Sequence, residues 1–338
     1  MGLEAAREVA REWYLRARRG DDPTVKPAEG ATLRDAFERH VRIIKQMART
    51  GHRQPRSVAD AEYDVQHYWG SYLDRELHSF SRMELHDIHA RLSDKNVHGP
   101  AAADRACKLF RADWRNMMLL HETLPDSPTV GIMWNGQQEE RKPIAWEVMP
   151  EFWRAIGEIR NPVRADLVRV LVLTGLRSLD ARTIKWGDID GLDGDEPTLH
   201  RPNPKGGPKK AFTVPISSAV AEVFRRRRAE NETLYPGTSL VFPTIGRDNR
   251  VTHIKNAEED SLRGFGYTPH IARHTFASAC SEAGLSALST KALLNHRSKD
   301  ITEGYQHLSM GHLREAIERV TAFLLEKARG AEAESEAA

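Results

Sequence analysis

The sequence of 338 residues has only two cysteines and no long apolar run. Cys107 and Cys280 form no CxxC pair, so a thiolate metal site is not expected, and both are predicted to be buried, reduced thiols. No stretch approaches the roughly 20 apolar residues that a membrane helix needs. The stretch before Gly20 is charged from Glu4 onwards and lacks the apolar core of a signal peptide. These absences predict a cytoplasmic protein without a membrane partner.

A strong excess of positive charge, the simplest sign of nucleic-acid binding, is also missing. Against 50 Lys and Arg stand 48 Asp and Glu, and the formal net charge is +2. The basic residues are instead clustered, in RARR at 16–19, KGGPKK at 205–210 and RRRR at 225–228. Binding to phosphates depends on where charge lies, so the near-neutral total neither opposes nor supports a nucleic-acid partner.

Composition and apolar spacing predict two domains joined by a connector. Apolar residues recur every three or four positions in four stretches of the N-terminal half, which predicts an all-α domain. The C-terminal half combines helical patterns with a hairpin at 197–216, where PNPKGG separates two β-prone pieces. The predicted fold is mainly α with a small β-sheet or hairpin. The predicted segments are 1–30 (a helix and a linker), 31–125 (the all-α domain), 126–145 (the connector), 146–330 (a mixed α+β domain) and 331–338 (a disordered acidic tail).

Two basic residues of the C-terminal half stand at turns. Arg177 follows the glycine turn of LTGLRS between two predicted helices, where a surface arginine is common. Lys205 lies in the glycine-rich turn of the hairpin, where a lysine is usually just solvated. Neither residue on its own indicates a function.

Two further patterns contain histidine, arginine and tyrosine. HIARHTF places His270 and Arg273 on one helix face, where both can address one anion. His270 and His274 have the spacing of zinc ligands, but isoleucine follows His270 where a metalloprotease has its glutamate, so no zinc site is predicted. His296 and Tyr305 follow in NHRSKDITEGY, and a single tyrosine near a helix usually packs against its neighbours.

Taken together, these patterns resemble the active-site signature of tyrosine recombinases of the phage integrase type. Five motifs occur in the family's order and spacing: TGLR with an acidic residue three positions after the arginine, PKGG before a VP-type strand, HxxRHTFA, LxHxS and YxH. The resemblance is strong over 145–330, which it identifies as the catalytic domain. It extends more loosely to 31–125, which is similar to the family's core-binding, SAM-like helical domain. The first helix resembles the end of the arm-binding domain of phage and genomic-island integrases, so most of that domain is expected to be missing.

The resemblance implies cleavage and rejoining of DNA through a 3′-phosphotyrosyl intermediate. Guanidinium groups stay protonated at any working pH and suit a phosphate clamp, whereas a phenol with a pKa near 10 needs help to lose its proton. The bond energy is kept in the protein–DNA link, so no metal or other cofactor is required. The implied roles are nucleophile for Tyr305, phosphate clamp for Arg177 and Arg273, assisting groups for His270 and His296, general acid for Lys205, orientation of Arg177 for Asp180, and DNA contacts for Lys209 and Lys210.

The resemblance also implies partners: double-stranded DNA at attachment or core sites, further copies of the chain in a tetramer on synapsed DNA, and accessory DNA-bending or directionality factors in a bacterial host. Integration or excision of a mobile element is the leading hypothesis. A chromosome-resolving recombinase, a type IB topoisomerase-like enzyme and a catalytically silent DNA-binding protein on the same fold are the alternatives.

Two structural questions stay open in the sequence. Asp180, Ala272 and Asn295 depart from the commonest pattern of the family, and Asn295, where glycine is usual, bears on the geometry of the loop at His296. The amphipathic segment 313–325 fits packing on its own domain and docking on a neighbouring protomer equally well.

Overall fold

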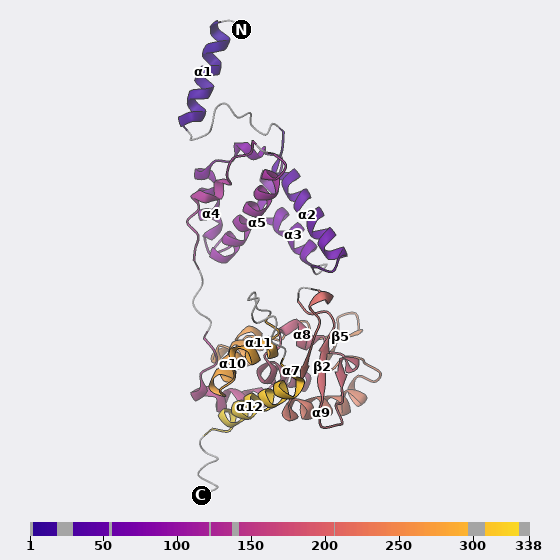
Figure 1. Ribbon diagram of the computed structural model, residues 1–338. Helices are drawn as coiled ribbons and strands as arrows, with labels where there is room; N and C mark the ends of the chain where they lie inside the picture. Colours follow the sequence, from indigo (N-terminus) through magenta and orange to yellow (C-terminus); the bar gives the residue numbers. More distant parts are fainter. Residues whose placement is uncertain are drawn as a thin grey trace. The chain divides into compact units, whose positions relative to one another are not determined.

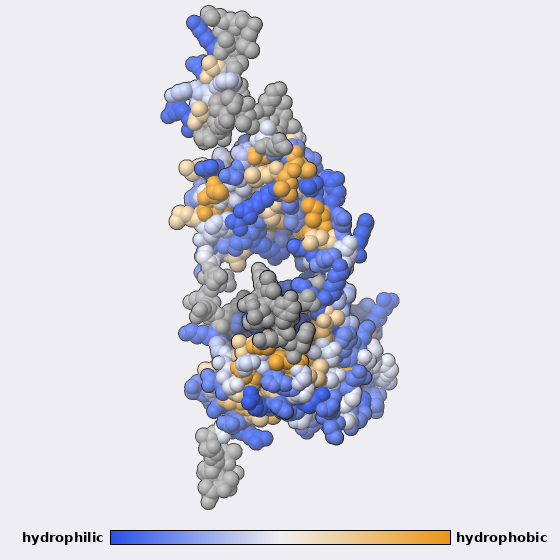
Figure 2. Space-filling view, viewed as in Figure 1, coloured by the Kyte–Doolittle hydropathy of each residue, from blue (hydrophilic) through white to orange (hydrophobic). Residues whose placement is uncertain are grey.

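The computed structural model describes residues 3–18, 30–53, 56–121, 123–136, 142–205, 207–296 and 308–330. The chain divides into two compact units, Met1–Gln138 and Glu139–Ala338 (Figure 1). The division falls inside the polar stretch 126–145. Most of the visible surface of each unit is hydrophilic, with apolar side chains in scattered patches (Figure 2). Among the described residues, no helix combines the length and apolar character of a membrane span.

Every helix or strand assigned in the described part of the Met1–Gln138 unit is a helix. The helices between residues 33 and 118 pack around an aromatic core in which the rings of Trp69 and Phe110 have centroids 4.8 Å apart. The indole of Trp114 donates to the carbonyl of Pro125 at 2.8 Å, which ties the chain after the last long helix back to the core. The elements are α1 (Leu3–Arg18), α2 (Leu33–Arg49), α3 (Arg56–Trp69), η1 (Gly70–Tyr72), η2 (Leu77–Ser79), α4 (Arg82–Ser93), α5 (Pro100–Met118) and η3 (Pro128–Gly131).

The Glu139–Ala338 unit combines helices with two small antiparallel sheets. Strands β1, β2 and β3 form one sheet in that order, with Leu199 opposite Val214 in the β2–β3 hairpin, and β4 pairs with β5. The elements are η4 (Trp146–Val148), α6 (Met149–Gly157), α7 (Pro162–Thr174), α8 (Ser178–Arg182), η5 (Trp186–Asp188), β1 (Ile189–Asp190), β2 (Thr198–Arg201), η6 (Pro208–Lys210), β3 (Phe212–Pro215), α9 (Ser218–Leu234), β4 (Pro243–Ile245), β5 (Val251–His253), η7 (Asp260–Phe265), α10 (Pro269–Glu282), α11 (Ala287–Leu293) and α12 (Met310–Arg329).

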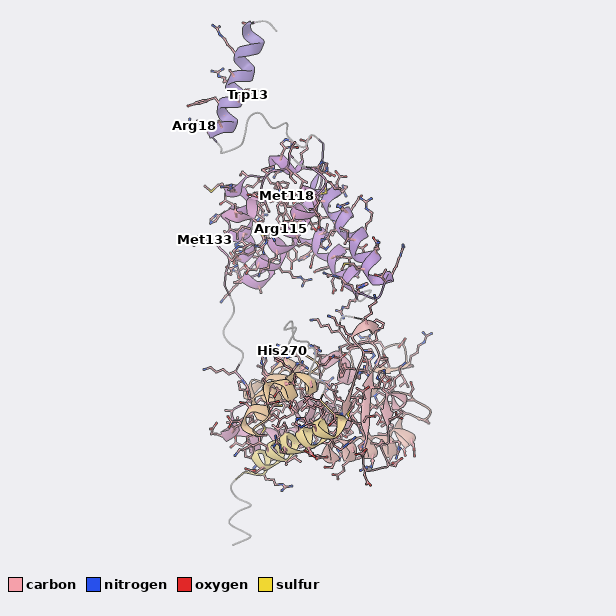
Figure 3. The ribbon with its side chains drawn as sticks, viewed as in Figure 1. Trp13, Arg18, Arg115, Met118, Met133 and His270 are labelled. Carbon is pink, nitrogen blue, oxygen red and sulfur yellow. The ribbon has the colours of Figure 1, made fainter. Side chains whose placement is uncertain are left out.

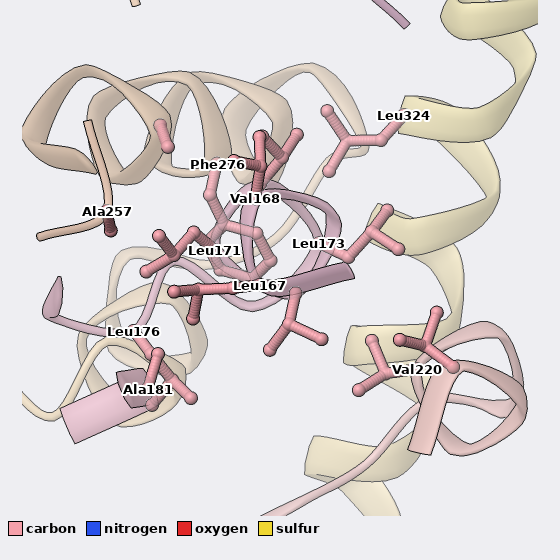
Figure 4. Packing of buried hydrophobic residues seen from close by; sticks show 14 of the residues in the cluster. Leu167, Val168, Leu171, Leu173, Leu176, Ala181, Val220, Ala257, Phe276 and Leu324 are labelled. Carbon is pink, nitrogen blue, oxygen red and sulfur yellow. The ribbon is translucent and has the colours of Figure 1, made fainter. Parts of the chain in front are cut away.

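Helix α7 is the centre of this unit. Its side chains are buried on nearly all sides, as the apolar sequence VLVLT at its end requires. Leu167 and Leu171 of α7 lie in one cluster with Phe276 of α10 and Leu324 of α12 (Figure 4). Burying an apolar side chain of this size contributes about 1.5–3 kcal/mol, so α7 is the main support for the helices around it.

The structure confirms the mainly α fold with a small sheet, and it adds detail that the sequence pattern lacked. The structure shows where the helices end, with α3 ending at Trp69 and α5 at Met118. The β4–β5 hairpin was not predicted, because its strands are too short to show an alternating pattern. Cys107 and Cys280 are buried and free, as expected.

The segment 313–325 packs on its own unit. Leu313, Ile317, Val320 and Leu324 of α12 are all buried in the core around α7. Its apolar face is therefore already covered within the chain.

The arginine cluster at 225–228 is used by the fold. Arg226 and Arg227 both pair with Asp166, which is buried on α7. Arg228 donates to Asp193 at 3.0 Å, and Arg225 donates to the carbonyl of Leu192 at 3.0 Å. Each of the four thus has a partner within the unit and holds α9 in place, so the dense positive sequence is not by itself a phosphate-binding patch.

Gly175 ends α7 in a left-handed conformation, with φ of 61°. A Cβ atom here would lie 2.6 Å from Phe276 Cδ1 and 2.8 Å from Leu294 Cδ2. We expect Gly175→Ala to lower the free energy of unfolding by about 2–4 kcal/mol, because backbone strain and steric overlap add. Urea unfolding measures this loss.

Gly237→Ala is the matched control, since Gly237 has φ of 75° but no atom within 4 Å of the added Cβ. It carries the strain without the overlap and should cost only about 1 kcal/mol. Equal losses in the two variants would contradict the tight packing around Gly175.

Candidate active site

Arg177 is placed by the turn that Gly175 makes possible. The chain leaves α7 at Gly175, and Arg177 then forms the N-cap of α8 with φ of −66°. Its side chain is half-buried. The glycine turn of LTGLRS therefore sets the position of the backbone that carries this guanidinium.

Arg273 lies on α10 and is only 7% exposed. Its Nη1 donates to the carbonyl of Gly175 and its Nη2 to the carbonyl of Leu294, both at 2.6 Å. These carbonyls belong to the C-terminal caps of α7 and α11, where helix dipoles favour a cation. Because a guanidinium carries five N–H groups, the two bonds are compatible with a bound phosphate. Burial and the nearby Arg177 lower the pKa of Arg273 to about 10, so the group stays charged at neutral pH.

His296 is presented by the C-terminal cap of α11. The amide of His296 donates to the carbonyl of Lys291 at 2.8 Å, and the amide of Asn295 donates to that of Ala292 at 3.0 Å, which is the Schellman arrangement. It requires a left-handed residue, and Asn295 supplies it with φ of 47°. Asparagine is one of the few residues besides glycine that adopts this conformation, so the departure from the family pattern keeps the loop geometry.

Charges from α8 and α10 act on His296. Its side chain is largely exposed, yet partial burial and the charges of Arg273 and Arg177 lower its pKa, with a smaller effect from His274. The neutral imidazole is therefore favoured. Both arginines thus act on the charge of His296, although the three residues lie far apart in the sequence.

Asp180 connects the arginines to the hairpin. It stands in the first turn of α8 and is 2% exposed. Its carboxylate accepts a hydrogen bond from the backbone amide of Lys205, and it faces the charges of Arg201, Arg177 and Arg273. Burial raises its pKa, and these interactions oppose that rise. The backbone at Lys205 is thus held to α8, while the Lys205 side chain is exposed.

His270 and His274 form a pair on α10. Both are exposed, and their rings meet edge to face with centroids 4.5 Å apart (Figure 3 labels His270). The sequence motifs indicated a role for His270 and none for His274, whereas His274 also acts on His296. The spacing of four residues, which places both side chains on one helix face, was the signal for this pairing.

The remaining expected residues divide into two groups. Lys209 and Lys210 lie exposed in η6, beside the hairpin turn. Tyr305 lies outside the described residues. The other group comes together where α7 and α11 end and α8 begins. It consists of Arg177, Asp180, Arg273, His296 and the Lys205 backbone.

Arg201 belongs to this neighbourhood and was missed in the sequence. It ends β2, is 3% exposed and faces Asp180. Leu199 and Arg201 share the buried face of the strand, and the alternation of side chains along a strand was the signal that could have found it.

As for metals, no group of three His, Cys, Asp or Glu side chains within the described ranges is placed to hold one.

Comparisons with known proteins show which proteins the chain resembles. Residues 154–312 match the model of the phage integrase family. The chain is 29% identical over 213 residues to the tyrosine recombinase XerA of Pyrococcus furiosus, covering 62% of this chain and 66% of XerA. It is 25% identical over 220 residues to the integrase of Haemophilus phage HP1, covering 64% of this chain and 59% of that protein. The matches thus span less than two thirds of the length of these relatives.

Solved structures show the same fold. The integrase of transposon Tn1549, in complex with a circular intermediate DNA, superposes with a TM-score of 0.61 at 13% identity, covering 86% of this chain and 100% of that one. A lambda integrase tetramer bound to a Holliday junction gives 0.58 at 16% identity, with 88% and 84% covered. Over residues 154–312 the chain thus matches the phage integrase family, it is similar in sequence to tyrosine recombinases and an integrase, and it shares the fold of solved integrases.

The lowered pKa of His296 can be tested by titration. Arg177→Gln removes one of the charges that disfavour the imidazolium, so we expect the pKa of His296 to rise relative to the unchanged chain. NMR of histidine-labelled protein, with His296→Gln to assign the signal, measures it. Arg263→Gln, in an exposed pair with Asp260, is the control and should leave the value unchanged.

The sign for stability follows from the same shift. The pKa of His296 in the folded chain lies below the usual histidine value of 6.5, so the unfolded chain takes up the proton first as the pH falls. His296 therefore reduces stability as the pH drops from about 6.5 through the folded pKa. A His296 signal that titrates above 6.5 would contradict this description of the site.

Proposed function

We propose that the chain is a site-specific integrase that cleaves and rejoins DNA through a 3′-phosphotyrosyl link on Tyr305, to integrate or excise a mobile element. The observation that carries the proposal is the convergence of Arg177 and Arg273 with Asp180 and His296 at one place. Paired guanidiniums beside an exposed histidine fit a phosphodiester whose charge grows during attack. Tyr305 follows His296 by nine positions in the sequence, which is compatible with a nucleophile at this cluster.

The two arginines would bind the non-bridging oxygens of the scissile phosphate. Arg273 is fixed by two backbone carbonyls, so its guanidinium is oriented before DNA arrives. Preorganised donors stabilise a transition state without reorganisation at the moment of reaction. Asp180 would keep the Arg177 side chain in place through the attraction between its buried carboxylate and the guanidinium.

Proton transfers would fall to the exposed groups. His270 or His296 would accept the phenolic proton of Tyr305 or hydrogen-bond the phosphate. Lys205 would protonate the departing 5′ oxygen, which leaves poorly as an alkoxide. The product keeps the energy of the broken bond in a phosphotyrosine, so a 5′-hydroxyl of another strand reverses the step.

DNA and further copies of the chain are the proposed partners. The related structures are integrases bound to a circular intermediate DNA and, as a tetramer, to a Holliday junction. In this chain the all-α segment 31–125 would bind core-site DNA, and Lys209 and Lys210 would contact phosphates beside the catalytic unit. Accessory bending or directionality factors would complete the assembly.

A chromosome-resolving recombinase is the second candidate function. Its support is the similarity to XerA and to XerC of Actinobacillus pleuropneumoniae, the latter 26% identical over 240 residues. Both functions use the same chemistry, so the sequence of the cleaved DNA separates them. Sites at the ends of a mobile element favour an integrase, and a chromosomal resolution site favours the alternative.

Covalent trapping tests the proposal. The protein is mixed in EDTA with labelled duplexes that carry a nick near a fixed scissile phosphate and random bases on both sides, and products are run on a denaturing gel. We expect a labelled band retarded by the mass of the protein, and sequencing of the captured strands gives the target. Tyr305→Phe should abolish the band.

Tyr235→Phe, which removes a phenol hydroxyl after α9, is the matched control and should retain the covalent band. Cleavage that persists in Tyr305→Phe would refute the proposed nucleophile. Duplex binding with no covalent product from any member of the pool would favour a silent DNA-binding protein.

The arginine clamp makes a separate prediction. Arg177→Met should lower the single-turnover rate of covalent complex formation by about 10²–10³, since one preorganised donor to the transition state is lost. Affinity for the captured duplex should change far less. Arg263→Met is the control on the same unit, and a similar rate loss there would show a general charge effect instead of a clamp.

A further inference from the structure

The geometry points to Arg201 as a positioning residue that fixes the turn carrying Lys205 against α8. This inference rests on the proposed role of Lys205 as the general acid. It concerns a residue that the sequence pattern left without a function.

Arg201 ties the end of β2 to two other elements. Its Nη1 donates to the Asp188 carboxylate at 2.6 Å, just before β1. Its Nη2 donates to the hydroxyl of Thr183 at 2.7 Å, and Thr183 is the C-cap of α8. The stem of the hairpin is therefore bound to the same short helix that carries Asp180 and follows Arg177.

The link from Arg201 to Lys205 is short and stiff. Only Pro202, Asn203 and Pro204 separate the two residues, and each proline fixes its own φ near −65°. At the far end, the amide of Lys205 donates to Asp180. The two ends of α8 thus hold the two ends of this link: Thr183 holds Arg201, and Asp180 holds Lys205.

Burying the charge of Arg201 costs free energy, so stability alone is a poor explanation for an arginine at this position. Arg201 is 3% exposed, and an ion pair taken out of water often stabilises a protein less than an apolar side chain of similar volume would. Leu199, two positions earlier on the same buried face of β2, shows that this face of the strand also packs an apolar side chain. What an apolar residue lacks is the directed bonding to Asp188 and Thr183, which sets the direction in which the turn leaves the strand.

The first experiment needs no DNA. Amide hydrogen exchange is measured at Lys205 in the full chain, for Arg201→Met and for Thr183→Ala, which removes one acceptor and keeps the bond to Asp188. We expect exchange at this amide to be at least about tenfold faster in both variants, because a bond to a charged group is lost or loosened. Thr183→Ala decides the matter if Arg201→Met does not fold.

Arg228→Met is the matched control, since Arg228 forms an exposed pair with Asp193 on the same unit and carries the same charge. It should leave the Lys205 amide unchanged. Unchanged exchange at Lys205 in a folded Arg201→Met or Thr183→Ala chain would overturn the inference.

The second experiment separates positioning of the acid from other damage. Covalent complex formation is measured on the nicked duplex pool with the ordinary scissile phosphate and with sulfur as its 5′ bridging atom. Attack on the sulfur substrate breaks a P–S bond and releases a thiolate, which leaves without being protonated. We expect Lys205→Ala and Arg201→Met to be slow on oxygen, by at least about tenfold, and to recover on sulfur.

The outcomes distinguish the two proposals. Failure of Lys205→Ala to recover on sulfur would refute the general-acid assignment and not the tether, which the exchange experiment tests independently. Recovery of Lys205→Ala without recovery of Arg201→Met would show that Arg201 acts through something other than Lys205, and this inference would fall.

Discussion

The guanidinium of Arg273 and its two carbonyl partners form the constraint on which the rest of the site depends. Gly175 and Leu294 lie more than a hundred residues apart, yet one side chain bonds to both. The bonds hold the end of α7 and the end of α11 at a fixed separation. Everything presented from these ends, including Arg177 and His296, takes its position from that contact. It forms because a cation is favoured at helix C-termini, where carbonyls have no intrahelical partner.

In this site the supporting residues are buried, whereas the residues proposed to transfer protons are exposed. Asp180, Arg201 and Arg273 are buried and bonded, so their positions are set before any ligand binds. The groups proposed to move protons, among them His296 and Lys205, are exposed and attached to those supports. Burying a charge costs free energy unless the charge is paired. Here the attraction between the arginines and the carboxylate in one region offsets part of the cost of desolvating them. A preorganised electrostatic environment is the expected result.

The basic residues of the chain serve two different purposes. The run at 225–228 looks like a phosphate-binding patch in the sequence, but its side chains stabilise α9 through Asp166, Asp193 and the Leu192 carbonyl. Lys209 and Lys210 lie exposed beside the hairpin turn. Density of positive charge along the sequence is therefore a poor guide to a DNA-binding surface, and the partners of each side chain decide the matter.

The sequence by itself determined the helical periods, the β2–β3 hairpin, the glycine turn before Arg177 and the order of the motifs, because all of these depend on neighbours a few positions apart. The tertiary structure alone decided which charges pair. Arg201 meets Thr183 and Asp188 across 18 and 13 positions, and Arg273 meets carbonyls 98 and 21 positions away. It also placed the apolar face of α12 on its own unit, a choice that amphipathic spacing leaves open. Spacing shows that a face must be covered; only packing in three dimensions shows what covers it.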